Sequence, residues 1–187
     1  LCDRLHNMRT GDGWPEQKRR DKALETMEVY APIAHRLGMA GVKEELEDRS
    51  LHYLDPVGYE EIKSYLAQND GADAFIGGIA QKISERLAEN GMAKATIKKR
   101  IKSVYGIYRK MYMQNKAFGE IYDVYAVRII LDTVSECYNA LGVIHDMYHP
   151  IPSRFKDYIS TPKPNGYQSL HTTVLGHEGV AFEVQIR

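Results

Sequence analysis

The chain has 187 residues, 43% of them apolar, and its 25 Lys and Arg residues balance its 25 Asp and Glu residues. This composition allows one sizeable core, or a core with a smaller helical part, but two cysteines are too few for a disulfide scaffold. No window approaches about 18 consecutive apolar residues, which excludes a membrane helix, and the balanced charge excludes a generally basic surface for nucleic acid.

The N-terminal half predicts helices, because apolar residues recur at three- and four-residue spacing and Gly or Pro separates the runs. A first helix ends near residue 10, before Gly11, Gly13 and Pro15, and a long one covers residues 16–39 with a kink at Pro32. Further helices are predicted over residues 42–54, 57–66 and 74–88, with a loop at Asn69-Asp70-Gly71.

After Gly91 the pattern changes to that of a sheet. A strand over 95–101 precedes a helix over 104–115, and the run 121–131 is rich in Val, Ile and Tyr, as in a strand buried on both faces. A helix over 135–148, a basic loop over 150–166 and strands over 169–175 and 180–187 follow, with Gly176-His177-Glu178-Gly179 between the strands. We therefore expect an α+β chain, with a helical bundle followed by a mixed sheet and flanking helices.

The most informative segment is the loop from Arg154 to Thr173, which combines cations, an Asn-Gly turn, an aromatic ring and a histidine. Arg and Lys can hold phosphate oxygens there, and a Tyr face can stack on a base, so the loop suits a nucleotide. The alternative is a solvated basic loop, since exposed charge is common on protein surfaces.

Two carboxylates, Asp123 and Glu183, stand on segments with strand character, and strand alternation could direct both to one end of the sheet. A divalent metal could there bridge them to a triphosphate. The alternative for each carboxylate is an ion pair with a nearby Arg.

Four motifs follow one another along the chain. The first, R-x-K-x-x-x-x-I-Y-x-K-M, starts at Arg100 and has Gly106 where Ser is more usual, and the second, I-Y-D-x-x-A-x-R, starts at Ile121. The third is the loop, which reads R-F-K-D-Y-I and then P-K-P-N-G-Y-Q-S-L-H-T-T-V, and the fourth is E-x-Q-I-R from Glu183. Together these motifs resemble the RelA/SpoT family of (p)ppGpp synthetases, and the basic Arg154-x-Lys156-Asp157 version resembles its bifunctional synthetase-hydrolases.

The resemblance implies a nucleotidyltransferase-like domain that moves pyrophosphate from ATP to the 3′-hydroxyl of GDP or GTP, giving (p)ppGpp and AMP. It implies that the catalytic residues and Mg²⁺ ligands are Asp123 and Glu183, and that ATP is bound by Arg100, Lys102 and Lys110. The residues implied for the guanine nucleotide are Arg154, Lys156, Lys163, Asn165, Tyr167 and His171. Seen alone, Tyr167 equally fits a ring that covers apolar surface, and His171 an ordinary strand histidine.

The N-terminal segment D-R-L-H-N-M-R-T, from Asp3, resembles the last metal-binding helix of the family's HD hydrolase domain. This implies that Asp3 is a Mn²⁺ ligand and that Asn7 contacts the alarmone, although their four-residue spacing equally fits a surface helix. The other ligands would precede Leu1, so we expect a fragment that does not hydrolyse (p)ppGpp by itself. We expect an HD remnant over 1–18, a helical connector over 19–55 and a synthetase domain over 56–187, truncated at its C-terminus.

The resemblance further implies ATP, GDP or GTP and (p)ppGpp as ligands, a cytoplasmic location, and a parent protein that also hydrolyses (p)ppGpp. Ribosome association through regions outside this chain is one option, and we expect neither membrane nor direct nucleic-acid binding. Two other functions stay open. One is a guanine-nucleotide-binding regulatory module without catalysis, and the other is a nucleotidyltransferase that moves a nucleoside monophosphate.

Overall fold

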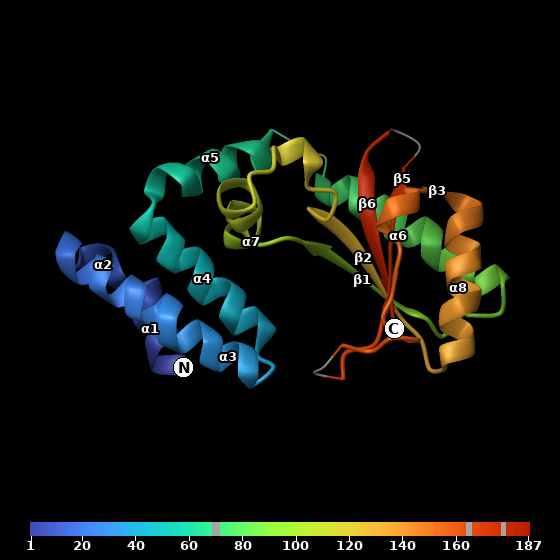
Figure 1. Ribbon diagram of the computed structural model, residues 1–187, viewed down its shortest axis with the longest axis horizontal. Helices are drawn as coiled ribbons and strands as arrows, with labels where there is room; N and C mark the ends of the chain where they lie inside the picture. Colours follow the sequence, from blue (N-terminus) through green and yellow to red (C-terminus); the bar gives the residue numbers. More distant parts are fainter. Residues whose placement is uncertain (69–71, 164–165, 177–178) are drawn as a thin grey trace. The chain divides into compact units, whose positions relative to one another are not determined.

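The computed structural model describes residues 1–68, 72–163, 166–176 and 179–187 (Figure 1). The chain divides into two compact units, which are described separately below. The first unit contains Leu1–Asn69 and Ser103–Phe118, and the second contains Asp70–Lys102 and Gly119–Arg187. The predicted loop Asn69-Asp70-Gly71 lies outside the described residues.

The first unit is helical. Its longer helices are α1 (Cys2–Arg9), α2 (Glu16–Glu25), α3 (Ala31–Arg36), α4 (Ala40–Leu54) and α5 (Pro56–Ala67), followed after residue 102 by the short α7 (Val104–Tyr108). Apolar side chains from α1, α2 and α4 form its core around Met8, Ala23 and Leu46, which are all fully buried. Ion pairs join the same helices, since Arg9 of α1 donates two hydrogen bonds to Glu45 of α4, at 2.7 and 2.6 Å.

The predicted kink at Pro32 takes the form of a widened turn. Helical structure continues from α2 through a π-helical turn at Thr26–Tyr30 into α3, which contains Pro32 and ends at Arg36. Proline has no N–H for the carbonyl one turn earlier, and a wider turn accommodates that missing donor without ending the helix.

Acidic residues of the connecting helices hold α7 in the first unit. The Asp48 carboxylate accepts from the backbone N–H groups of Val104 (3.3 Å) and Tyr105 (2.8 Å) at the start of α7. The Tyr108 hydroxyl donates to Asp55 at 2.9 Å. A π-helical turn, Arg109–Met113, extends α7, so the helix predicted over 104–115 is present in two parts.

The second unit is a mixed sheet with two helices. The sheet order is β1-β2-β6-β5-β3, with β4 also paired to β5; only β2 and β6 are parallel among these pairs. The strands are β1 (Thr96–Ile101), β2 (Tyr125–Ile130), β3 (His149–Pro150), β4 (Lys156–Asp157), β5 (Leu170–Leu175) and β6 (Ala181–Ile186). The helices are α6 (Ala72–Glu89), which contacts β1 and β2, and α8 (Val134–Met147), which contacts β3, β5 and β6.

One face of this sheet is apolar and covered by both helices (Figure 1). Its side chains alternate with those of the other face, and Val127, Ile129, Phe182, Val184 and Ile186 are fully buried on it. On α8, Thr133 and Glu136 form a capping box, which satisfies backbone N–H groups at the start of the helix. The helical covering leaves the opposite face of the sheet to polar residues.

The predicted fold class is confirmed, because a helical part is followed by a mixed sheet with flanking helices. Two details of the sheet were predicted wrongly. The segment 121–131 becomes a strand only at Tyr125, and the loop 150–166 contains the short strands β3 (in part) and β4. The turn predicted at Gly176–Gly179 falls partly outside the described residues, and the domain boundaries at residues 18 and 55 stay predictions.

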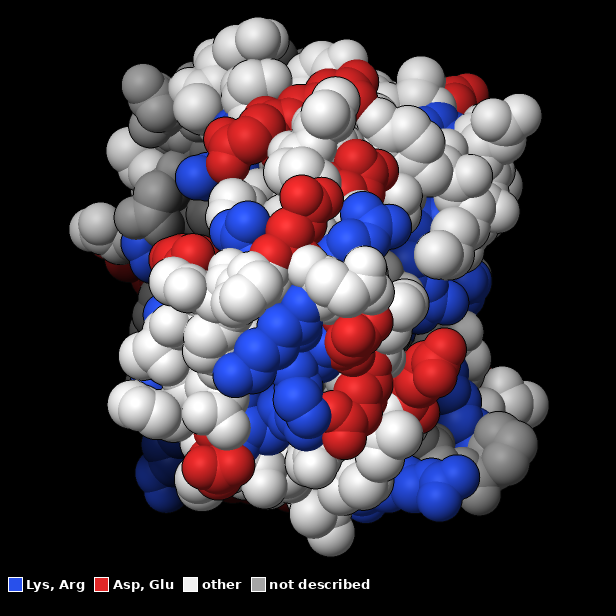
Figure 2. Space-filling view, turned by 90° about the vertical axis from the view of Figure 1, so that its left-hand side faces the viewer, with Lys and Arg blue, Asp and Glu red and all other residues white. Residues whose placement is uncertain are grey.

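The described surface carries both signs of charge. On the face shown in Figure 2, basic side chains gather near the centre and acidic side chains border and interrupt them. No helix in the described ranges has both the length and the apolar character needed to cross a membrane.

Candidate active site

The polar face of the sheet brings together residues from several strands. Register places Ala126 and Arg128 of β2 beside Glu183 and Gln185 of β6, and His171 and Thr173 of β5 lie beside Gln185 and Glu183 on the other side. Arg100 of β1 is paired with Ala126, and Lys156 of β4 with His171. Because directly paired residues share a face of a sheet, these side chains form one continuous polar surface, called the polar face below.

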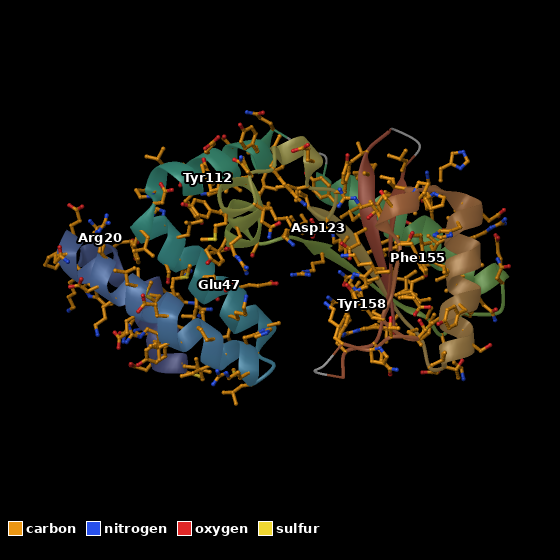
Figure 3. The ribbon with its side chains drawn as sticks, viewed as in Figure 1. Arg20, Glu47, Tyr112, Asp123, Phe155 and Tyr158 are labelled. Atoms are coloured by element: carbon orange, nitrogen blue, oxygen red, sulfur yellow. The ribbon has the colours of Figure 1, made fainter. Side chains whose placement is uncertain are left out.

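Asp123 lies at one end of this face, in the turn that leads into β2 (Figure 3). This corrects the expectation that it stands on a strand: β1 ends at Ile101, opposite Tyr125, so regular pairing of β2 starts two residues after Asp123. The backbone N–H of Lys102 still donates to the Val124 carbonyl at 2.9 Å. This bond holds Lys102 near the turn, where its Nζ donates to Asp123 Oδ2 at 2.9 Å.

Glu183 is the most enclosed carboxylate of the face, with a side chain 13% exposed. His171 Nδ1 lies 2.6 Å from its Oε1, and Gln185 Nε2 donates to the same oxygen at 2.9 Å. Burial opposes ionisation of this carboxyl, but the hydrogen bonds from His171 and Gln185 outweigh burial and hold the pKa of Glu183 below its ordinary value. Glu183 is therefore a carboxylate near neutral pH.

Within the described residues between β4 and β5, the rings of Tyr158 and Tyr167 lie beside His171. The Tyr167 hydroxyl lies 2.9 Å from His171 Nε2, and the Tyr158 ring stands edge-on to His171 at 5.4 Å between centroids. Gly166 has a φ of +76°, a conformation that favours glycine. The backbone N–H of Lys163, before this glycine, donates to the carbonyl of Tyr167, after it, at 3.1 Å. Lys163 Nζ lies 4.5 Å from the Tyr158 ring centre and 5.3 Å from that of Tyr167.

Other predicted residues lie in several places. Arg154 is exposed and its guanidinium lies 4.9 Å from the Tyr122 ring centre, beside the turn that carries Asp123. Lys110 belongs to the first compact unit, so the structure does not group it with Arg100 and Lys102 of the second. Asn165 lies outside the described residues.

The residues predicted as a hydrolase remnant lie on α1. Asn7 Nδ2 donates to Asp3 Oδ2 at 3.0 Å, as their four-residue spacing on one helix face allows. In the described part of the chain, no three His, Cys, Asp or Glu side chains lie close enough to hold a metal ion by themselves. Asp3 alone therefore does not fit a Mn²⁺ site.

Asp123 and Glu183 do fit a cation that is shared with a substrate. Asp123 lies in the turn that leads into β2, and Glu183 of β6 is paired with Ala126 of β2. Burial and the charge of Asp123 both raise the pKa of Glu183, but the hydrogen bonds to His171 and Gln185 keep that pKa below its ordinary value. Mg²⁺ is commonly held by one or two carboxylates together with substrate phosphates and water, so two carboxylates are sufficient protein ligands. Among the described residues, the bonds of Glu183 to His171 and Gln185 fall on Oε1, so a metal or the reacting hydroxyl would meet Oε2.

Gln185 is a member of the polar face to which sequence reasoning gave no role, although it stands in the E-x-Q-I-R motif. Arg128 of β2, which is not among the predicted site residues, donates hydrogen bonds to the Gln185 side chain. The position of Gln185, two residues after Glu183, could have indicated that it belongs to the site, since residues i and i+2 of a strand share a face.

Known proteins match the chain along its whole length. Residues 99–187 match the model for the region found in RelA/SpoT proteins, and residues 1–40 match an HD domain. The chain is 49% identical to a probable guanosine-3′,5′-bis(diphosphate) 3′-pyrophosphohydrolase of Synechocystis and 47% identical to a bifunctional (p)ppGpp synthase/hydrolase RelA of Mycobacterium tuberculosis. Each match covers all of this chain and 25% of the relative, so the chain spans about a quarter of their length.

A solved structure shares the fold. The small alarmone synthetase 1 of Bacillus subtilis, bound to its product pppGpp, superposes with a TM-score of 0.55 at 19% identity, covering 67% of this chain and 73% of that one. Synthetases and HD hydrolases of these families generally use divalent metals. On the sequence matches, the chain belongs to the RelA/SpoT family and contains the RelA/SpoT region preceded by an HD-domain segment.

Proposed function

We propose that this chain carries the pyrophosphate-transfer site of an alarmone synthetase. The observation that carries the proposal is the pair Asp123 and Glu183 at the polar face, with Lys102 bonded to the first and His171 to the second. A carboxylate pair bordered by cations suits a metal-bound triphosphate, and relatives named as (p)ppGpp synthases support this reading. A domain that only bound nucleotides would have no need of both carboxylates.

In the proposed reaction, the 3′-oxygen of GDP or GTP attacks the β-phosphorus of ATP. The bond between that phosphorus and the oxygen bridging it to the α-phosphate breaks, AMP leaves, and the hydroxyl proton goes to Glu183. Mg²⁺, when bound by Asp123 and Glu183, supplies charge stabilisation for the transferred phosphates. The protein mainly positions the two nucleotides.

The proposed ATP residues are Arg100, Lys102 and Lys110. Tyr167 stacks on guanine and Asn165 hydrogen-bonds its edge, while phosphates of the acceptor are held by Arg154, Lys156, Lys163 and His171. Lys102 and His171 already bond to the two carboxylates, so both side chains lie where phosphate oxygens would be bound.

For the whole protein we propose a cytoplasmic enzyme that also hydrolyses (p)ppGpp at a Mn²⁺ site, to which Asp3 and Asn7 contribute together with ligands from elsewhere. Ribosome association is proposed only as a property of regions outside this chain. The boundaries at residues 18 and 55 are likewise proposals, and the two compact units divide the chain differently, because Ser103–Phe118 belongs to the first unit.

The test uses the full-length protein with Mg²⁺, labelled ATP and GDP, and separates the products by chromatography. We expect AMP and ppGpp to form together, and Asp123→Asn and Glu183→Gln to lower kcat about 100-fold or more, or about 3 kcal/mol, without loss of fold. Release of pyrophosphate instead of AMP would identify nucleotidyl transfer. GDP binding without any product would identify a regulatory module.

A further inference from the structure

Gln185 stands at the centre of the polar face and is 7% exposed. It has Arg128 on one side, through the parallel pairing of β2 and β6, and His171 on the other, through the antiparallel pairing of β5 and β6. Glu183 lies two residues earlier on the same strand and therefore on the same face.

The orientation of the Gln185 amide is fixed by its neighbours. Its Oε1 accepts from Arg128 Nε (3.4 Å) and from a terminal guanidinium nitrogen of Arg128 (3.2 Å), while its Nε2 donates to Glu183 Oε1 at 2.9 Å. A guanidinium can only donate and a carboxylate only accepts, so a flipped amide would lose both interactions. Arg128 thus ensures that an N–H group faces Glu183.

This chain of bonds acts on one oxygen of the carboxylate. Gln185 and His171 both bond to Glu183 Oε1, so rotation of the carboxylate would break two hydrogen bonds in an enclosed site. The second oxygen, Oε2, is consequently held in one direction, ready for the reacting group.

We propose that Gln185 is a positioning residue, and that Arg128 orients its amide so that Gln185 fixes Glu183 for proton acceptance. The inference rests on the proposed pyrophosphate transfer and deepens it. Gln185 touches no substrate in this role, so its loss lowers kcat and leaves nucleotide binding nearly unchanged.

The main test compares Gln185→Glu and Gln185→Met in the full-length protein. Gln185→Glu keeps the size of the side chain and an acceptor for Arg128 but removes the donor to Glu183; Gln185→Met removes both. Supporting residues of active-site ligands typically contribute about 10- to 100-fold, so we expect both variants to lose about that much kcat. KM for ATP and for GDP should change by less than about 2-fold.

The matched control is Thr172→Val. Thr172 is a buried residue of β5 whose hydroxyl lies 2.9 Å from His145 Nε2, on the helix-covered face of the same sheet. Its replacement removes a buried hydrogen bond of the same length without touching the polar face. The melting temperature should fall in this variant, while kcat should stay normal.

A double variant tests the role of Arg128. If Arg128 acts on the reaction through Gln185, the double variant Arg128→Met/Gln185→Met should have the same kcat as Gln185→Met alone. A change in the KM for ATP of the double variant does not affect this comparison. Multiplied losses in kcat would overturn the role given to Arg128. Normal kcat in Gln185→Glu, in a protein that makes AMP and ppGpp, would overturn the positioning role alone; a wild-type protein that makes neither product would overturn both proposals.

Discussion

The ring and the hydroxyl of Tyr167 have different contacts, and mutation can separate them. Its ring lies beside Lys163 and Tyr158, and its hydroxyl lies 2.9 Å from His171 Nε2. If the ring stacks on guanine, Tyr167→Ala should weaken GDP binding by about 1–3 kcal/mol, roughly 5- to 150-fold, in isothermal titration. Tyr167→Phe keeps the ring and should lose about 1 kcal/mol or less.

Phe155 supplies a control in the same loop. It is 41% exposed, and its ring lies edge-on, at 6.4 Å between centroids, to His145 of α8, a residue that has no role in the proposed site. It is labelled with Tyr158 in Figure 3. Phe155→Ala should leave GDP affinity unchanged. Equal weakening in Tyr167→Phe and Tyr167→Ala would show that the hydroxyl, not the ring, carries the interaction.

Residue types could be predicted at the candidate site, but their bonds could not. The motifs identify Glu183, His171 and Tyr167, yet the hydrogen bond between His171 and Glu183 depends on the register of β5 on β6, which no local pattern specifies. Asp123 was expected on a strand because Ile121–Leu131 is uniformly rich in strand-forming residues. Where β2 begins depends on where its partner β1 ends.

Two helical glycines allow the effect of backbone entropy on stability to be measured separately from the effect of packing. Gly142 of α8 is exposed, and a Cβ built on it would meet nothing within 4 Å. In α5, a Cβ on Gly58 would lie 2.6 Å from Asp55 Oδ2 and 2.8 Å from Tyr108 Cε2. Gly142→Ala should therefore stabilise the protein by about 0.5–1 kcal/mol, whereas Gly58→Ala should destabilise it by about 1–3 kcal/mol.

Urea unfolding followed by circular dichroism measures both changes, with wild type in the same buffer. A destabilised Gly142→Ala variant would contradict the first expectation and indicate that α8 requires glycine at this exposed position. A neutral Gly58→Ala variant would show that Asp55 can move away without losing its bond to the Gly58 N–H, which caps α5.

Elements with strong periodicity were predictable and irregular ones were not. The capping box at Thr133 and the long amphipathic run after it identify α8. The two-residue strands β3 and β4 have no periodicity of their own and exist because β5 offers them a pairing edge. The π-helical turn before Pro32 is likewise a response to context, since the pattern around it is that of an ordinary helix.

The stability of the whole chain should depend on acid pH through Glu45. The hydrogen bonds from Arg9 lower the pKa of Glu45 to about 2, against the desolvation that would raise it, and Arg49 adds to the lowering. Because the folded pKa lies below the ordinary value, this carboxylate stabilises the fold above about pH 4.5 and loses that contribution as the pH falls towards 2.

Glu45→Gln provides the comparison for this effect. Its free energy of unfolding should be lower than that of wild type at pH 7, and the difference should shrink as the pH is lowered from 4.5 to 2. Urea titrations at several pH values measure it. A difference that stayed constant over this range would mean that Glu45 acts by packing and not by its charge.

The division into two units was the part of the architecture least accessible from the sequence. A helical part and a sheet part were expected in succession, but residues 103–118 return to the first unit after β1 has been made. The hydrogen bonds responsible, from Val104, Tyr105 and Tyr108 to Asp48 and Asp55, join residues more than 50 positions apart. Local patterns carry no information on such contacts.

That return of the chain governs how this protein can be recombined with its relatives. A chimera joined near residue 55 would take Asp48 and Asp55 from one parent and α7 from the other, so the three hydrogen bonds that hold α7 would rest on foreign partners. Exchange of the helical unit as a whole requires transplanting Ser103–Phe118 along with it. The helical unit is therefore discontinuous in the sequence, and a graft designed from one breakpoint would divide this compact unit.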